Sequence, residues 1–301
     1  MLELIVYGIV FGSIISIGAI GLSLVFGIIR FANFAHGDLM STGAYIALLM
    51  VTWALAWIPD TNFGQLSFGW RMLIAFPVAM FVVALVAIAL DRILYQKLRR
   101  QGSGPVIMAM SSLGAAFILR MLILIFWGAD SLFYRPGILR PAIELPGGVK
   151  IRPDQILILV TVFALVALLH LFLQKTKLGK AMRATADNME LALVSGIDTE
   201  RVIIFTWGIG GALAAAGGIL YGIDVQVHPY MGWNFLIPLF AATILGTVGN
   251  IYGALAGGLV IGVAQQVSTA FLMPTYKPAV AFILMILILL VRPKGIFGGK
   301  D

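Results

Sequence analysis

The chain has 301 residues, of which 61% are hydrophobic and only 11% are charged. Soluble domains carry charge on about a quarter of their residues, so this composition excludes an ordinary water-soluble domain. The apolar runs are long and continuous rather than alternating, which excludes an outer-membrane β-barrel and predicts an all-α bundle of membrane-spanning helices. The sequence has no cysteine, which excludes disulfides and thiolate metal sites.

The sequence predicts eight or nine membrane segments in a single transmembrane domain over residues 1–301. A span of the bilayer core takes about 20 residues, so two of the segments, 235–245 and 279–291, are too short to cross upright. The first run is too long for a signal peptide and has no basic residue before it, so we expect a retained first helix. In chain order the apolar segments are Leu4–Ile29, Leu39–Trp57, Met72–Leu94, Val106–Trp127, Gln155–Leu173, Ile203–Ile223, Phe235–Leu245, Ile251–Phe271 and Ala279–Val291.

The segment 235–250 has two interpretations. Phe235–Leu245 is followed by Gly246, Gly249 and Asn250. Either a half-helix dips into the bilayer and ends there, or one helix continues past the glycines.

The basic residues predict the orientation. If the segments alternate sides, thirteen of the 20 basic residues fall on one face, including those of the charged stretch 174–200. Basic residues mark cytoplasmic loops, so we expect the N-terminus outside, the C-terminus in the cytoplasm and an odd number of crossings. Seven crossings with a re-entrant pair, or nine, satisfy this. The net charge of +7 then belongs to cytoplasmic loops and does not indicate nucleic-acid binding.

Two long loops lie on opposite sides. The external loop 128–154 is rich in proline and is expected to form an ordered cap. The cytoplasmic loop 174–200 is built like helix: Gly179–Ala186 reads as one short helix, and Asp187 with Glu190 as the capping box of a second that ends at Gly196. A helix of eight residues is marginal alone in water, so it must pack on the membrane surface, the bundle or a partner protein. Its mixed charges favour a protein partner over anionic lipid.

Glycines recur at the four-residue spacing that lets helix backbones approach closely. Any polytopic bundle uses small residues in this way, but the total of 34 glycines also suits helices that slide or rotate against one another. The candidate packing positions are Gly208, Gly211, Gly218, Gly253, Gly257 and Gly262.

Charge inside the spans is scarce. Asp38, Asp91 and Asp224 lie near predicted span ends, and only Arg120 lies clearly inside. Arg120 is about 10 Å from Trp127 along a helix, so we expect it to reach the outer interface rather than bind a carboxylate. A proton relay, paired catalytic acids, an HExxH metal motif and a phosphate-binding GxxxxGK[ST] loop are all missing, which argues against an enzyme. Energy for active transport must therefore come from another protein.

The turn from Arg30 to Asp38 places polar residues between aromatic ones and is expected to lie at membrane depth. Asn33, His36 and Asp38, with Arg120, are candidates to line a translocation path or gate. The alternative is an interfacial turn whose Asn and Asp only cap the next helix.

Four motifs resemble the LivH-type family, the permeases of branched-chain amino acid ABC importers. They are Gly21–Gly27 with Asn33–Gly37, Gly179–Ile197, Ala242–Gly262 and Arg292–Gly298. The resemblance implies a bacterial inner-membrane importer that also contains a second permease subunit, two cytoplasmic ATP-binding subunits and an external solute-binding protein. It implies no cofactor in this chain, with ATP and magnesium held by the partner. It also places the ATPase-docking segment at Arg183–Gly196, with Arg183, Ala184, Asp187, Glu190, Ala192 and Gly196 as coupling residues.

The cargo and one rival function stay open at this level. Leucine, isoleucine and valine are expected from the larger branch of the family, whereas other members carry urea or short amides. A stand-alone passive channel would also lack coupling residues, and it predicts transport that ignores ATP. It leaves the helices of 174–200 with nothing to dock on.

Overall fold

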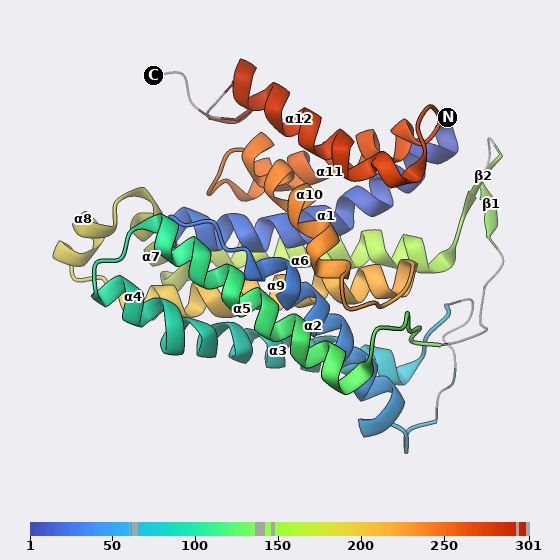
Figure 1. The fold of residues 1–301 in the computed structure, drawn as a ribbon, viewed down its shortest axis with the longest axis horizontal. Coiled ribbons are helices and arrows are strands. Elements are labelled where there is room, and N and C mark those ends of the chain that lie inside the picture. Colours follow the sequence, from blue (N-terminus) through green and yellow to red (C-terminus); the bar gives the residue numbers. More distant parts are fainter. Residues whose placement is uncertain (60, 62–65, 136–141, 146–147, 293–294, 299–301) are drawn as a thin grey trace.

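The computed structural model describes residues 1–59, 61, 66–135, 142–145, 148–292 and 295–298. Over these residues the chain is a helical bundle with one short antiparallel hairpin (Figure 1), which confirms the predicted class. In the hairpin, Ile143 pairs with Ile151. The elements are α1 (Leu2–Ile29), α2 (Ala35–Leu49), η1 (Met50–Ala54), α3 (Trp70–Leu90), η2 (Asp91–Tyr95), α4 (Gln96–Arg100), α5 (Pro105–Trp127), β1 (Ile143–Leu145), β2 (Val149–Ile151), α6 (Pro153–Lys175), α7 (Lys177–Asp187), α8 (Met189–Val194), α9 (Thr199–Asp224), α10 (Met231–Leu245), α11 (Ile251–Ser268), η3 (Pro274–Tyr276) and α12 (Lys277–Val291).

Seven helices of the described chain are long and apolar enough to cross a membrane. The last of them runs from Pro274 to Val291, so the prediction that this segment is too short was wrong, because η3 and the first turn of α12 lengthen it. The predicted span Leu39–Trp57 is not among the seven. Its helix begins earlier, at Ala35, and its first turn carries His36 and Asp38.

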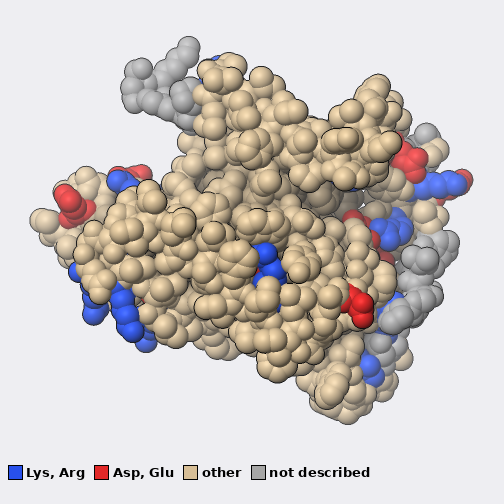
Figure 2. All heavy atoms as spheres, in the orientation of Figure 1, with Lys and Arg blue, Asp and Glu red and all other residues tan. Residues whose placement is uncertain are grey.

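The bundle has two chemically distinct ends (Figure 1). The hairpin end carries β1, β2 and the start of α1, and the α8 end carries α4, α7, α8 and the end of α12. On the face shown in Figure 2, charged groups gather at these two ends and the band between them is almost free of charge. Because α1 begins at one end and α12 finishes at the other, the chain makes an odd number of passes along the bundle.

Helix α1 forms the centre of the bundle. It packs against α6, α9, α10 and α11, and it is buried along most of its length. Its run of Ile, Leu, Val, Gly and Ala residues is apolar on every side, as a helix surrounded by other helices must be. By contrast α12 has a single buried residue, Ala281.

Helices α2 and α10 begin inside the bundle. After α1 ends at Ile29, Arg30 adopts the left-handed conformation (φ 59°) and the chain turns back. His36 Nε2 then lies 2.9 Å from the carbonyl oxygen of Gly18, a level roughly 16 Å before the end of α1 at 1.5 Å per residue. The two short helices cross there: a Cβ on Gly37 would lie only 2.2 Å from the carbonyl oxygen of Gly232.

Helix α10 ends at Leu245 and α11 starts at Ile251. The alternative in which one helix continues past the glycines was therefore wrong. Instead, the two helices pack backbone against backbone, since a Cβ on Gly253 would meet the carbonyl oxygen of Gly246 at 1.6 Å.

The glycines chosen by their spacing differ in how closely a neighbouring helix approaches. Added Cβ atoms at Gly218, Gly257 and Gly262 would lie 2.0–2.1 Å from backbone atoms of α2, α10 and α1. At Gly211 the nearest atom would be the Ala87 Cβ at 2.7 Å. Gly208 meets only the end of Ile88, at the ordinary distance of 3.4 Å.

The loop 128–154 is tied to the bundle where the structure describes it. Leu132 forms a β-bridge with Val227, and the Tyr134 hydroxyl donates to the Ala44 carbonyl oxygen at 3.1 Å. Burial raises the pKa of Tyr134 well above its usual range, so this donor stays protonated. Pro136, Pro141 and Pro146, on which the expected cap partly relied, lie outside the described residues.

Candidate functional site

Arg120 and Asp38 form a buried ion pair within the bundle. Arg120 Nε lies 3.0 Å from Asp38 Oδ1 and Nη2 lies 2.8 Å from Oδ2, a bidentate geometry. Arg120 is 4% exposed and Asp38 is 0% exposed. The expectation that Arg120 reaches the outer interface was therefore wrong. The early start of α2 brings a carboxylate from 82 positions away to the guanidinium, and the charge-assisted pair satisfies both groups.

Three half-exposed aromatic rings cover the guanidinium. Its Cζ lies 4.8 Å from the centroid of the Trp233 ring, 5.5 Å from that of Phe117 and 5.8 Å from that of Tyr230. Such distances allow cation–π attraction, which is strongest for Trp. We call Asp38, Phe117, Arg120, Tyr230 and Trp233 the Arg120 cluster. It combines α2, α5 and α10 and lies beside the crossing of the two short helices.

Sequence reasoning did not single out Tyr230 or Trp233. They belong to the Arg120 cluster only because α10 begins inside the bundle, and no local pattern signals that. Charged groups inside membrane proteins face the bundle interior or a water-filled cavity rather than lipid. The Arg120 cluster is therefore the candidate site on the α2–α5–α10 side of the bundle.

Asn33 and His36 are both fully buried at the start of α2. The Asn33 Oδ1 accepts from the Ala35 amide at 3.1 Å, but the N-cap of α2 is Phe34 and has no side-chain cap hydrogen bond, so Asn33 does not cap the helix as the alternative interpretation held. However, Asn33 Nδ2 and His36 Nδ1 form no hydrogen bond with the described part of the chain. Unmet buried polar atoms are costly, so these two atoms are candidates to gain partners in another state.

The loop 174–200 forms two short helices, as predicted. Thr176 caps α7 by accepting from the Gly179 amide at 2.9 Å. The cap of α8 is Asn188, which accepts from the Leu191 amide at 2.9 Å. The predicted capping box of Asp187 and Glu190 was therefore wrong, because α7 runs one residue longer and ends with Asp187. Gly196 has φ 81°, the left-handed conformation expected there.

Helix α8 presents an uncovered apolar surface. Ala192 packs inward at 4% exposure, whereas Leu191, Leu193 and Val194 are 64%, 60% and 85% exposed. Among the coupling residues, Arg183, Asp187 and Glu190 are exposed and Ala184 is half-buried. Arg183 Nη1 donates to the Gln174 Oε1 at 3.0 Å. A six-residue helix with this surface lacks the packing that would stabilise it.

Helix α7 contacts α1 and faces the break between α10 and α11 across a cavity. This cavity, of about 610 Å³, is lined by Gly27, Arg183, Gly249 and others. The Gly249 amide donates to Ser23 Oγ at 2.9 Å, and the Ile296 amide donates to the Leu245 carbonyl oxygen at 2.9 Å. Parts of all four motifs that carried the resemblance therefore lie near one another at the α8 end.

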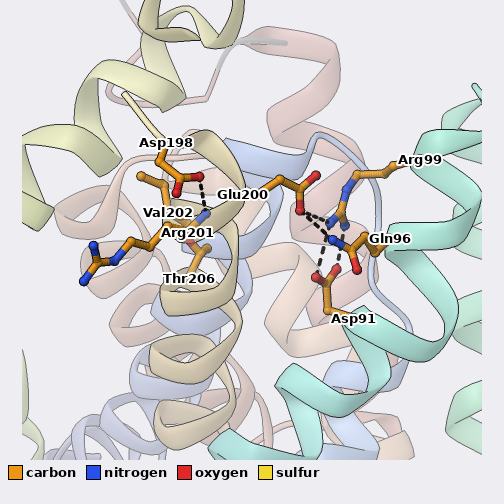
Figure 3. Close-up of polar contacts among 8 residues, drawn as sticks. All are labelled: Asp91, Gln96, Arg99, Asp198, Glu200, Arg201, Val202 and Thr206. Atoms are coloured by element: carbon orange, nitrogen blue, oxygen red, sulfur yellow. Dashed lines mark hydrogen bonds and ion pairs between the residues drawn. The ribbon is translucent and has the colours of Figure 1, made fainter. Parts of the chain in front are cut away.

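A second polar cluster joins the start of α9 to α4 (Figure 3). Arg99 binds the buried Asp91 through two contacts of 2.6 and 3.2 Å, and Glu200 Oε2 accepts from Gln96 at 3.0 Å. Arg99 also lies 3.8 Å from Glu200. The only feature of the sequence that could have indicated this ion pair is the eight-residue spacing of Asp91 and Arg99, and it did not enter the prediction. The contacts of this cluster hold the start of α9, which follows α8, against α4.

Each of the three aspartates at predicted span ends has an arginine partner, since Asp224 binds Arg152 at 2.6 Å. These acids are therefore engaged in ion pairs. Within the described ranges, no group of three His, Cys, Asp or Glu side chains could hold a metal ion.

Comparison with known proteins agrees with this architecture. Residues 4–289 match the family model described as "Branched-chain amino acid transport system / permease component". The chain belongs to this permease family. It is 36% identical to the high-affinity branched-chain amino acid transport system permease protein BraD of Pseudomonas aeruginosa, with 100% of this chain and 96% of BraD aligned. It is 32% identical to LivH of Escherichia coli K12, with 98% and 94% aligned.

More distant permeases match a smaller part of the chain. The xylose transport system permease XylH of Haemophilus influenzae is 29% identical over 39% of this chain and 33% of its own length. No solved structure matches the permease at a significant level. The permease is thus a multi-pass membrane subunit of an importer, and its relatives are transport components rather than enzymes.

Proposed function

We propose that this permease imports branched-chain amino acids as a membrane subunit of an ATP-driven ABC importer. The names of its full-length relatives support this cargo. Partial matches to permeases named for xylose and autoinducer 2 indicate that related chains serve other solutes, so the cargo depends on local side chains rather than on the fold. A neutral or zwitterionic cargo suits the scarcity of charge along the spans.

The exposed apolar surface of α8 supports ATP hydrolysis by a docked partner as the energy source. An ATP-binding subunit docks on Arg183–Gly196, binds ATP and Mg²⁺ and hydrolyses the nucleotide. Docking buries Leu191, Leu193 and Val194, which are exposed in the free chain. A passive channel gives this surface no role.

The remaining partners follow from the two ends of the bundle. The α8 end, with the C-terminus, faces the cytoplasm, and the hairpin end, with the N-terminus, faces outward toward a solute-binding protein. A second permease subunit completes the pathway, and a second ATP-binding subunit docks on it. Asn33, His36, Asp38 and Arg120 line the path or gate where α2 and α10 cross.

Co-purification tests the proposal. The permease, expressed with its neighbouring permease and ATP-binding genes, is isolated through a tag on this chain, and ATP hydrolysis is measured with and without the solute-binding protein and leucine. We expect a four-subunit transporter whose hydrolysis rises with loaded binding protein. Isolation of this chain without an ATPase, together with ATP-independent uptake, would favour a passive channel. If urea or short amides stimulate ATP hydrolysis and leucine does not, the proposed cargo is wrong and those compounds replace it.

A further inference from the structure

A second cavity, of about 620 Å³, opens at the hairpin end, away from the Arg120 cluster. In Figure 2, acidic and basic groups gather around a hollow at this end of the molecule. Five helices and the hairpin contribute to its wall. Its lining includes Tyr7, Phe11, Lys150, Arg152, Gln155, Tyr221, Asp224, Gln266 and Lys277.

Lys277 places an ammonium without an acidic partner in this wall. Its Nζ donates to Gln266 Oε1 at 2.8 Å and lies 5.7 Å from the Phe11 ring centroid. None of the acidic residues in the described ranges forms a salt bridge with it. The side chain is half-buried, so water compensates its charge only in part. An ammonium in this setting favours an anionic group in the cavity.

Asp224 supplies the opposite charge in the same wall. Its Oδ1 accepts from Arg152 at 2.6 Å and from Gln155 at 3.1 Å. These bonds hold the carboxylate in place and leave Oδ2 without a hydrogen bond to the described residues. The cavity therefore offers one fixed acceptor and one unpaired cation.

The chemistry of the wall matches an α-amino acid. A carboxylate would bind the Lys277 ammonium, and an α-ammonium would bind Asp224 Oδ2. The rings of Phe11 and Tyr221 provide apolar surface for an aliphatic side chain. A carboxylate without an α-ammonium would bind only Lys277. An amino-acid amide, which keeps the α-ammonium but lacks the carboxylate, would bind only Asp224.

We propose that this cavity is an outer binding site for a zwitterionic α-amino acid, occupied before the solute reaches the Arg120 cluster. The inference is built on the proposed cargo class and outward orientation of the hairpin end. It assigns Lys277 and Asp224 as specificity-determining residues.

The test uses the complete importer in proteoliposomes, with binding protein outside and ATP inside. Uptake of leucine is measured for the wild type, Lys277→Gln, Lys277→Arg and Lys97→Gln, the last an exposed lysine at the α8 end. Loss of a charge-assisted hydrogen bond predicts that Lys277→Gln raises the half-saturating leucine concentration about tenfold or more, whereas Lys277→Arg largely restores it and Lys97→Gln leaves it unchanged.

Competition separates the two charged contacts. In the wild type, unlabelled leucine should compete better than 4-methylpentanoate, which lacks the ammonium, or leucinamide, which lacks the carboxylate. In Lys277→Gln the advantage of leucine over leucinamide should shrink. If the wild type imports leucine and Lys277→Gln matches it in both measurements, the outer site is wrong while the proposed function stands. If the wild type imports no leucine at all, the proposed function itself fails.

Discussion

Arg120 and Asp38 meet in a bidentate ion pair of 2.8 and 3.0 Å although they lie 82 positions apart on α5 and α2. The pair is possible because α2 starts inside the bundle, and it fixes the first turn of α2 to the middle of α5. Trp233 and Tyr230 cover the guanidinium from the start of α10, so the pair also contacts α10. The pair thus stands beside the crossing of α2 and α10.

Breaking this pair from one side should destabilise the permease strongly. Arg120→Gln leaves a buried carboxylate, and Asp38→Asn leaves a buried guanidinium; each should cost about 3–5 kcal/mol. The double variant removes both charges and should recover part of that loss. Thermal unfolding in detergent, followed by tryptophan fluorescence, measures the three effects. Equal, additive losses in the double variant would show that the two residues act independently.

The crossing of α2 and α10 should tolerate no added methyl group. In Gly37→Ala the new Cβ meets the Gly232 carbonyl at 2.2 Å, so the helices must separate, at a cost of about 1–3 kcal/mol or more. Gly208→Ala is the matched control, because its Cβ would meet only Ile88 at 3.4 Å. Unfolding temperature and leucine uptake are measured for both. Similar losses in the two variants would mean that close approach at Gly37 is not required.

The apolar surface of α8 should hold the ATP-binding subunit. Leu191→Ser with Val194→Ser exchanges two exposed apolar side chains for polar ones, so folding should be preserved while the ATPase is lost on purification. Phe271→Ser, which alters a 77% exposed ring at the hairpin end, is the control. Normal recovery of the ATPase with the α8 variant would place the docking surface elsewhere.

The two acidic residues of the second polar cluster, Asp91 and Glu200, should differ in how much their contacts with Arg99 stabilise the fold. Arg99→Gln leaves the buried Asp91 without its cation, whereas Glu200→Gln removes a half-exposed carboxylate 3.8 Å from Arg99. Surface pairs contribute about 0–1 kcal/mol, so Glu200→Gln should barely change the unfolding temperature and Arg99→Gln should lower it clearly. The reverse order would indicate that Asp91 is stabilised by groups other than Arg99.

The sequence predicted the helical class and the two short helices of 174–200, because apolar runs, glycine and capping residues are local signals. It did not predict the partner of Arg120, since that depends on the depth at which α2 begins. The cap of α8 was misplaced by one residue because Asn188 and Asp187 are both good caps. Helix α12 was predicted too short because its first turn lies in the polar-looking segment around Lys277.

Uptake through this permease should be driven by ATP hydrolysis in a docked partner. Proteoliposomes containing the complete importer, with loaded solute-binding protein outside, are supplied internally with ATP or with a non-hydrolysable analogue, and radiolabelled leucine is followed over time. Leucine should accumulate above its external concentration with ATP and should not accumulate with the analogue. Equal, purely downhill entry in both preparations would contradict ATP-driven uptake.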